Sequence, residues 1–208
     1  VVGPRKDYGR RAMLPHNVPF TLLGAGLLWF GWFGFNAGSA LAANDVAVLA
    51  FVNTLLAPAA ALATWTAIDL VREGRATAVG AATAIVVGLV GITPAAGYVS
   101  PASALLIGGL AAVPSYFALI LRARTTLDDS LDVVAAHGLG GATGALLTGV
   151  FADPAWSGGP AGVVAGNPGQ IVTQLASIVA VAAYSGIATF AILKALALVM
   201  PLRIAGRV

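Results

Sequence analysis

The sequence predicts an all-α polytopic membrane protein, and three observations lead to this fold class. Hydrophobic residues make up 59% of the 208 residues and charged residues only 9%, whereas a soluble domain carries roughly 25% charged residues. Six apolar stretches are each long enough to cross the hydrocarbon core of a bilayer, which needs about 20 residues of helix. Finally, the cationic residues all fall on one side of the membrane if these stretches cross in succession.

The six stretches differ in what bounds them. The first follows Pro15-His16-Asn17 and is rich in glycine, the second ends just before Arg72, and the third contains Pro94, which removes a helical hydrogen bond. A run of acids precedes the fifth, and acids in the first turn of a helix cap it and complement its dipole. We expect membrane-spanning helices over residues 19–41, 46–70, 78–97, 102–121, 131–151 and 171–200.

The segments outside these stretches have a simple assignment. Residues 1–18 are predicted to form a cytoplasmic loop, and residues 201–208 the start of a cytoplasmic tail. Residues 152–170 are rich in glycine and proline and are expected to form a longer extracellular loop. The N-terminal residues are basic and lack an apolar core, so they do not form a signal peptide.

The distribution of lysine and arginine predicts the orientation. Short cytoplasmic loops carry an excess of these residues, so both termini are expected in the cytoplasm of a cell whose inner membrane holds the protein. Topology also explains the net charge of +3 better than binding to nucleic acid does. The eleven cations are Arg5, Lys6, Arg10, Arg11, Arg72, Arg75, Arg122, Arg124, Lys194, Arg203 and Arg207.

Several kinds of chemistry lack the residues that they need. The chain has no cysteine, so neither a disulfide nor a thiolate metal site can form. Its two histidines, His16 and His137, are far apart and cannot by themselves hold zinc or iron. No nucleophile–base pair or phosphate-binding glycine loop is visible. We therefore expect no enzyme activity, no metal and no cofactor.

His137 is the strongest functional candidate, because it lies well inside an apolar helix. On regular helical geometry it is roughly 12 Å beyond Asp129, and an ionisable group near the bilayer midplane is a functional-site hypothesis by default. Because desolvation disfavours charge, we expect a neutral imidazole with one donor and one acceptor nitrogen. The alternative is a structural histidine that holds two helices together. Asp129, Val133, His137 and Gly141 are spaced four residues apart and are expected on one helix face.

Other polar and aromatic residues have equally plausible structural roles. Asp129 is either a helix cap or a functional acid, and Asp69 is expected to pair with Arg72 three residues later. The run Trp29-Phe30-Gly31-Trp32-Phe33-Gly34-Phe35-Asn36 is either an interfacial belt or part of a pore in which a ring faces a cation. Ser39, one turn beyond Phe35, could accept a hydrogen bond from such a cation.

Five stretches together resemble the ammonium transporter family (Amt/Mep/Rh), and specifically the second half of Amt-type members. They occur in family order over nearly the whole chain, and a first half is not represented. The stretches are Pro15-His16-Asn17, Trp32-Phe33-Gly34-Phe35-Asn36-Ala37-Gly38-Ser39, Ala50-Phe51-Val52-Asn53-Thr54, Gly88-Leu89-Val90-Gly91-Ile92-Thr93-Pro94-Ala95-Ala96-Gly97-Tyr98, and Asp128-Asp129-Ser130-Leu131-Asp132-Val133 with His137-Gly138.

The resemblance implies the fold and the assembly. The family fold has eleven helices in two inverted five-helix repeats plus a long last helix, and it assembles as a homotrimer with one pore per protomer. Residues 19–151 would be the second repeat and residues 171–200 the last helix. The chain would then supply half of a pore that the first half completes.

The resemblance also implies roles for individual residues. By motif, Phe35 is similar to one of two phenylalanines that close the outer end of the pore, and Ser39 to the serine that helps recruit ammonium. Trp32 resembles the pore-side tryptophan, and His137 the second of two paired pore histidines. Asp129 resembles the family's acid on the cytoplasmic side, while Val133 and Thr93 resemble pore-proximal positions.

The expected function is transport of ammonium or ammonia through a hydrophobic, histidine-lined pore. Two alternatives remain: a Rh-like channel for ammonia or carbon dioxide, and a membrane domain that senses ammonium. A PII-type signal protein is a further expected partner on the cytoplasmic face. Trp32 and the run 50–54 favour the Amt-type reading over the Rh-like one.

Overall fold

The computed structural model describes residues 1–5, 8–9 and 15–203, and within these ranges every regular element is helical. The elements are α1 (Val18–Gly38), α2 (Asp45–Glu73), α3 (Ala78–Ile92), α4 (Pro101–Arg122), η1 (Val134–Leu139), α5 (Gly140–Phe151), α6 (Pro154–Ser157) and α7 (Gly169–Val199). This confirms the predicted all-helical class. Five of the helical segments, with η1 and α5 counted as one, are long and apolar enough to cross a membrane.

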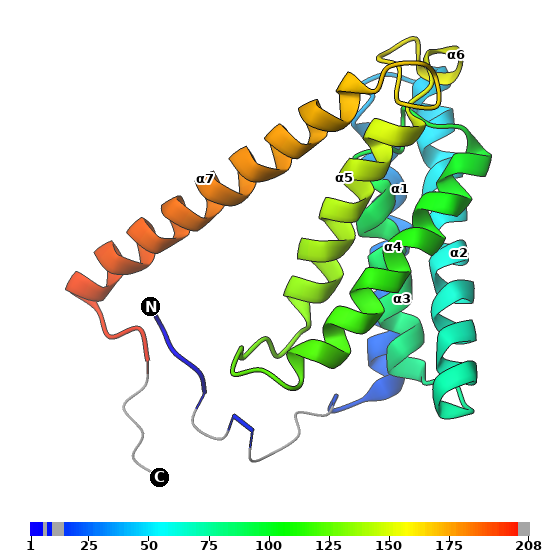
Figure 1. Cartoon of the computed structure of the whole chain (residues 1–208). Helices are drawn as coiled ribbons and strands as arrows, with labels where there is room; N and C mark the ends of the chain where they lie inside the picture. The colour runs from blue at the N-terminus through cyan, green and yellow to red at the C-terminus, as the bar shows by residue number, and fades with distance from the viewer. Residues whose placement is uncertain (6–7, 10–14, 204–208) are drawn as a thin grey trace.

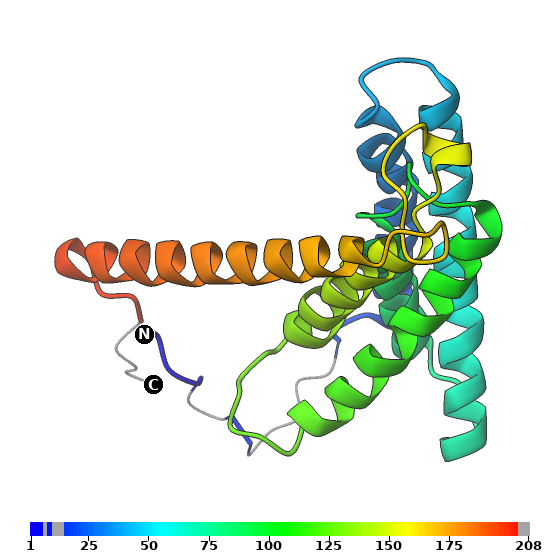
Figure 2. The same ribbon diagram turned by 45° about the horizontal axis from the view of Figure 1, so that its top comes forward.

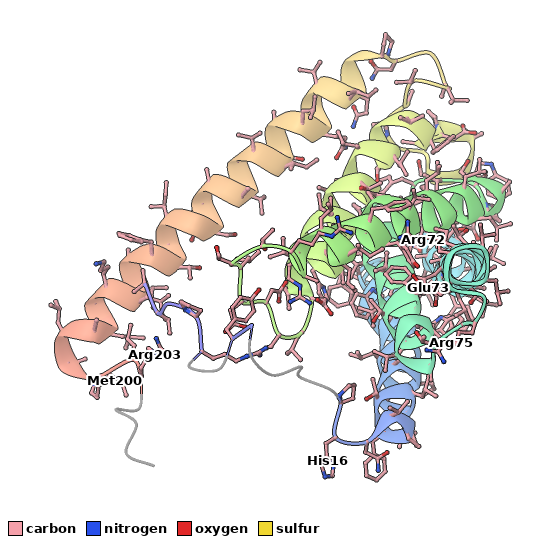
Figure 3. The ribbon with its side chains drawn as sticks, turned by 60° about the horizontal axis from the view of Figure 1, so that its bottom comes forward. His16, Arg72, Glu73, Arg75, Met200 and Arg203 are labelled. Atoms are coloured by element: carbon pink, nitrogen blue, oxygen red, sulfur yellow. The ribbon has the colours of Figure 1, made fainter. Side chains whose placement is uncertain are left out.

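The helices run alternately up and down, as successive crossings require (Figure 1). The α1–α2, α3–α4 and α5–α7 connections gather at one end of the molecule, and the α2–α3 and α4–η1 connections at the other. Arg72, Arg75 and Arg203 all lie toward this second end (Figure 3). These three arginines therefore lie at the end that the predicted orientation assigns to the cytoplasm, while Lys6, Arg10, Arg11 and Arg207 lie outside the described residues.

The core of the molecule is the packing of α2 against α3 and α4. Glycine permits this close approach: a Cβ on Gly108 of α4 would lie 2.0 Å from the carbonyl oxygen of Ala57 in α2. A Cβ on Gly88 of α3 would lie 2.5 Å from the Cα of Pro58. Small residues at helix contacts are typical of membrane proteins, where packing drives helix association.

Two helices leave most of their apolar surface uncovered. The 31-residue α7 diverges from the bundle, contacts α5 alone among the described elements, and has no buried residue (Figures 1 and 2). The 21-residue α1 buries only Ala25 and Asn36. Lipid or further protein must cover these surfaces, because an apolar area of this size exposed to water would promote association.

Two expected helices differ from the prediction. The third ends at Ile92 instead of residue 97, because the chain enters successive turns at Thr93 ahead of Pro94. The fifth begins at Val134 with a π-helical segment instead of at residue 131. Of the residues expected four apart on one helix face, Asp129 lies before the helix, so its place on that face is wrong, whereas His137 and Gly141 line the same groove.

The expected ion pair between Asp69 and Arg72 is also wrong. Asp69 is buried, and its carboxylate accepts the backbone N–H of Thr77 at 3.4 Å. The Arg72 guanidinium lies instead over the rings of Tyr116 and Phe117, at 5.9 and 5.5 Å from their centroids. The aspartate therefore holds the α2–α3 connection, while the arginine packs on aromatic faces.

Candidate pore-lining site

A side-chain hydrogen bond joins two predicted pore residues from different helices. The indole Nε1 of Trp32 in α1 donates to the hydroxyl Oγ1 of Thr93, 2.8 Å away, where α3 ends. The same hydroxyl donates to the carbonyl of Leu89 at 2.8 Å. The Thr93 hydroxyl therefore donates to a backbone carbonyl near the end of α3 and accepts from the indole of Trp32. Together these bonds hold the Trp32 ring against α3.

Phe35 and Ser39 follow Trp32 toward the end of α1. The Phe35 ring is exposed and meets the Trp32 ring edge-on, with centroids 5.5 Å apart. Ser39 is the residue after the helix, and its hydroxyl donates to the carbonyl of Phe35 at 2.6 Å. This bond uses the hydroxyl proton and leaves the oxygen free to accept a hydrogen bond from a cation.

His137 lies on η1 and is exposed to a groove of about 360 Å³. Its imidazole makes no hydrogen bond to any part of the chain that the structure describes. The other lining residues, from η1, α5 and α7, are small or apolar apart from two serines. His137 is therefore the one titratable residue among the described residues that line the groove. The lining residues are His137, Gly138, Gly141, Ala142, Ala145, Ser177, Ile178, Val181, Ala182 and Ser185.

The Trp32 group and His137 do not meet within this chain. In the described part of the molecule, α3 contacts both α1 and η1, but α1 and η1 do not contact each other. The structure thus brings together Trp32, Thr93, Phe35 and Ser39, and holds His137 on a separate element beside the same helix.

Asp129 caps the start of the histidine helix. Its two carboxylate oxygens accept the backbone N–H groups of Val133 at 3.0 Å and Val134 at 2.7 Å. This is the structural role weighed in the sequence analysis, since these N–H groups have no partner within a helix. The Val133 side chain, by contrast, is exposed.

Sequence reasoning did not single out a buried polar set that orders the helices behind the site. The fully buried Asn53 donates through Nδ2 to the carbonyls of Ala96 and Val99, both at 2.8 Å. Thr54 accepts from Asn36 at 3.0 Å. An amide in the middle of an apolar span was the available signal, because lipid-facing positions do not select asparagine.

The described residues offer no metal site. No group of three or more His, Cys, Asp or Glu side chains among them is arranged to hold an ion. The chemistry available here is hydrogen bonding, cation–π attraction and exclusion of water.

Comparison with known proteins decides the family. A sequence profile of the Ammonium Transporter Family matches residues 1–207. The chain belongs to the ammonium transporter family. It is 46% identical over 205 residues to an ammonium transporter of Aquifex aeolicus, covering 98% of this chain and 48% of that protein. It is 40% identical to ammonium transporter Amt1 of Archaeoglobus fulgidus, covering 99% of this chain and 52% of the relative.

Solved structures agree with this assignment. The crystal structure of Candida albicans Mep2 matches with a TM-score of 0.84 at 38% identity, over 93% of this chain and 45% of that one. A structure described as a sensor Amt protein matches with a TM-score of 0.84 at 29% identity, over 98% of this chain and 50% of that one. The chain thus spans about half the length of the relatives it matches, and this family member is a multi-pass membrane protein.

Proposed function

We propose that this chain forms one half of a pore that passes ammonium or ammonia across a membrane. The observation that carries the proposal is the position of His137, a polar ring exposed on the wall of a largely apolar groove, in the first turn of the membrane-length helix Val134–Phe151. A lipid-facing or purely packed position would not call for an imidazole. Family membership supports the choice of ammonium as substrate.

The route begins at the end of α1. Phe35 and Trp32 present aromatic faces to which an ammonium ion is attracted, and the free lone pairs of the Ser39 oxygen accept one of its hydrogens. Moving a hydrated ion into an apolar channel costs a large free energy of dehydration. We therefore propose that the ion gives its proton to water before the dry section, that ammonia passes, and that the proton crosses separately, so that one charge moves with each ammonia.

His137 then acts on the neutral molecule. A neutral imidazole offers one N–H donor and one acceptor nitrogen, so it can replace a water partner for ammonia and relay a proton. Asp129 holds the start of this helix, Thr93 holds Trp32, and Val133 stands exposed near the same end. Only the bonds of the transferred proton change in this scheme, so the protein is proposed to be a transporter and not an enzyme.

The complete assembly is part of the same proposal. A preceding half of the transporter would cover the exposed surfaces of α1 and α7 and close the pore. We propose a homotrimer in the cell (inner) membrane with both ends of this chain in the cytoplasm, where a PII-type signal protein is the candidate partner.

The experiment joins this chain to the first half of the Aquifex aeolicus relative and reconstitutes the product in vesicles. An ammonium-dependent current on a supported membrane is the expected result. Flux of ammonia without current would favour a gas channel instead. Ammonium binding without any flux would favour a sensor, the reading suggested by the match to a sensor Amt structure.

A further inference from the structure

The histidine helix begins at an unusual residue. Asp132 has a φ of +55°, a left-handed conformation that is uncommon for residues other than glycine and is best tolerated by aspartate and asparagine. Its carbonyl accepts the N–H of Ala136 at 2.8 Å, so the first turn of the helix starts from this residue. The orientation of Asp132 therefore sets the direction in which the helix begins.

An ion pair fixes this residue to the neighbouring helix. Oδ1 of Asp132 lies 2.6 Å from Nη2 of Arg122, the last residue of α4, and both side chains are largely shielded from water. Neither the Arg122 Nε nor the Asp132 Oδ1 has a hydrogen-bond partner among the described residues, so the contact between the two side chains is an ion pair. The contact thus joins the end of α4 to the start of η1 through a single pair.

The far end of the same helix is fixed by close packing. A Cβ on Gly144 of α5 would lie 2.0 Å from the carbonyl oxygen of Gly91. One on Gly140 would lie 3.4 Å from the hydroxyl of Ser115. The close backbone approach of Gly144 to Gly91 leaves α5 little freedom to rotate or slide against α3.

Between these two fixed ends the chain forms a π-helix over Val134–Leu139. A π turn contains one residue more than an α turn, and each residue of an α-helix turns it by about 100°. The π segment therefore sets which way His137 faces relative to α5. In the observed register Ala136 is buried in a hydrophobic cluster that includes Trp65 and Val87, while His137 and Gly138 line the groove.

We propose that Arg122 and Asp132 are positioning residues, whose ion pair holds the start of η1 against α4 and thereby keeps the π register that presents His137 to the groove. Without the pair, the segment can relax toward regular α-helix and turn the imidazole away. Its consequence for transport rests on the proposed function, but the geometric part does not. The alternative is that the Asp129 cap alone holds the helix start.

The absence of cysteine allows the register to be measured with single-cysteine reporters. We would place cysteine at Ala135, which is buried, or at His137, which faces the groove, and measure reaction with a charged methanethiosulfonate in lipid. In the unmodified background His137→Cys should react fast and Ala135→Cys slowly. In Asp132→Asn and Arg122→Gln backgrounds we expect Ala135→Cys to react about tenfold faster and His137→Cys to slow. Loss of the extra residue of the π turn moves each residue into the place of its predecessor, so residue 135 takes the place of exposed Val134 and residue 137 that of buried Ala136.

Three variants make this test specific. Asp132→Asn keeps a residue that tolerates positive φ, so it isolates the charge. Arg122→Lys keeps the charge and should preserve the original reactivities, and Arg124→Gln, an exposed arginine of the same connection, should change nothing. Unchanged reactivities in Asp132→Asn and Arg122→Gln would overturn the proposal in favour of the Asp129 cap. Fast reaction at both positions would also overturn it, because that result reports loss of the helix and not a new register.

A transport measurement on the joined protein separates this inference from the proposed function. If the reporters exchange reactivity and the ammonium current falls in Asp132→Asn, both the positioning role of the ion pair and the proposed role of His137 are supported. If the reporters exchange while the current is unchanged, positioning stands and the role of His137 fails. If the current falls while the reporters keep their reactivities, the positioning role is overturned and the pore assignment is untouched.

Discussion

The indole of Trp32 and the hydroxyl of Thr93, from helices α1 and α3, share a 2.8 Å hydrogen bond at the point where α3 ends. This bond fixes the aromatic ring that in turn meets Phe35 edge-on. One threonine thus connects the end of a helix to the aromatic surface proposed to attract ammonium.

Thr93→Val should weaken this connection. Valine has nearly the same shape but leaves the partly buried indole N–H without a partner, at a cost of about 1–3 kcal/mol in the free energy of unfolding. Thr93→Ser keeps the hydroxyl and should stay close to the unmodified chain. Unfolding by denaturing detergent, followed through tryptophan fluorescence, would measure both. Equal stability of the valine and serine variants would contradict the role given to the hydroxyl.

Asn53→Asp should destabilise the helix bundle more than Asn53→Leu. The carboxylate keeps the shape of the amide but loses both N–H groups, so it would face the carbonyls of Ala96 and Val99 without a donor. Leucine leaves these carbonyls unpaired but adds no charge, and each unpaired buried group costs about 1–3 kcal/mol. The same detergent unfolding ranks the variants. An aspartate variant as stable as the original would show that the two carbonyls find other partners.

Gly108→Ala should disrupt the contact between α4 and α2. Its methyl group would lie 2.0 Å from the Ala57 carbonyl oxygen, and the backbones must separate to admit it. Overpacking of this kind costs about 1–3 kcal/mol or more. Gly186→Ala in α7 is the matched control, since a Cβ there has no atom within 4 Å. Thermal unfolding in detergent should fall for the first and not for the second; equal midpoints would contradict the close packing.

Sequence reasoning recovered the all-helical class and the order of the long helices because the apolar stretches are long, but five segments of the described chain and not six are long enough to cross a membrane, since Ala78–Ile92 is shorter than expected. It missed the early end of α3 because hydropathy continues past Ile92 through Thr93 to Gly97, while the backbone does not. Only Pro94 signalled the change. The Asp69 carboxylate likewise accepts a hydrogen bond from the α2–α3 connection instead of pairing with Arg72. Helical spacing alone does not show which of two nearby partners a side chain binds.

The sequence predicted which residues belong to the candidate site but not how they are arranged in space. His137 and Trp32 stand out from sequence because polar and aromatic groups are conspicuous within apolar helices. In our proposal the π turn arises because two contacts fix the chain on either side of it: the Arg122–Asp132 ion pair and the packing of Gly144 on Gly91. Both contacts join segments that are distant in the sequence, so helical periodicity cannot predict them. Periodicity assumes a constant 3.6 residues per turn, so it placed Asp129 and His137 on a common face.

The most direct measurement of the account is the ammonium-dependent current of the joined transporter carrying His137→Ala, beside the same protein carrying His16→Ala. His16 lies in the segment before α1 and is not among the residues that line the groove of His137, so its removal should leave the current unchanged. Loss of the His137 imidazole should reduce the current about tenfold or more, because the group that we propose to relay protons is removed. A His137→Ala transporter with the original current, and the original preference for ammonium over sodium and potassium, would contradict the central claim.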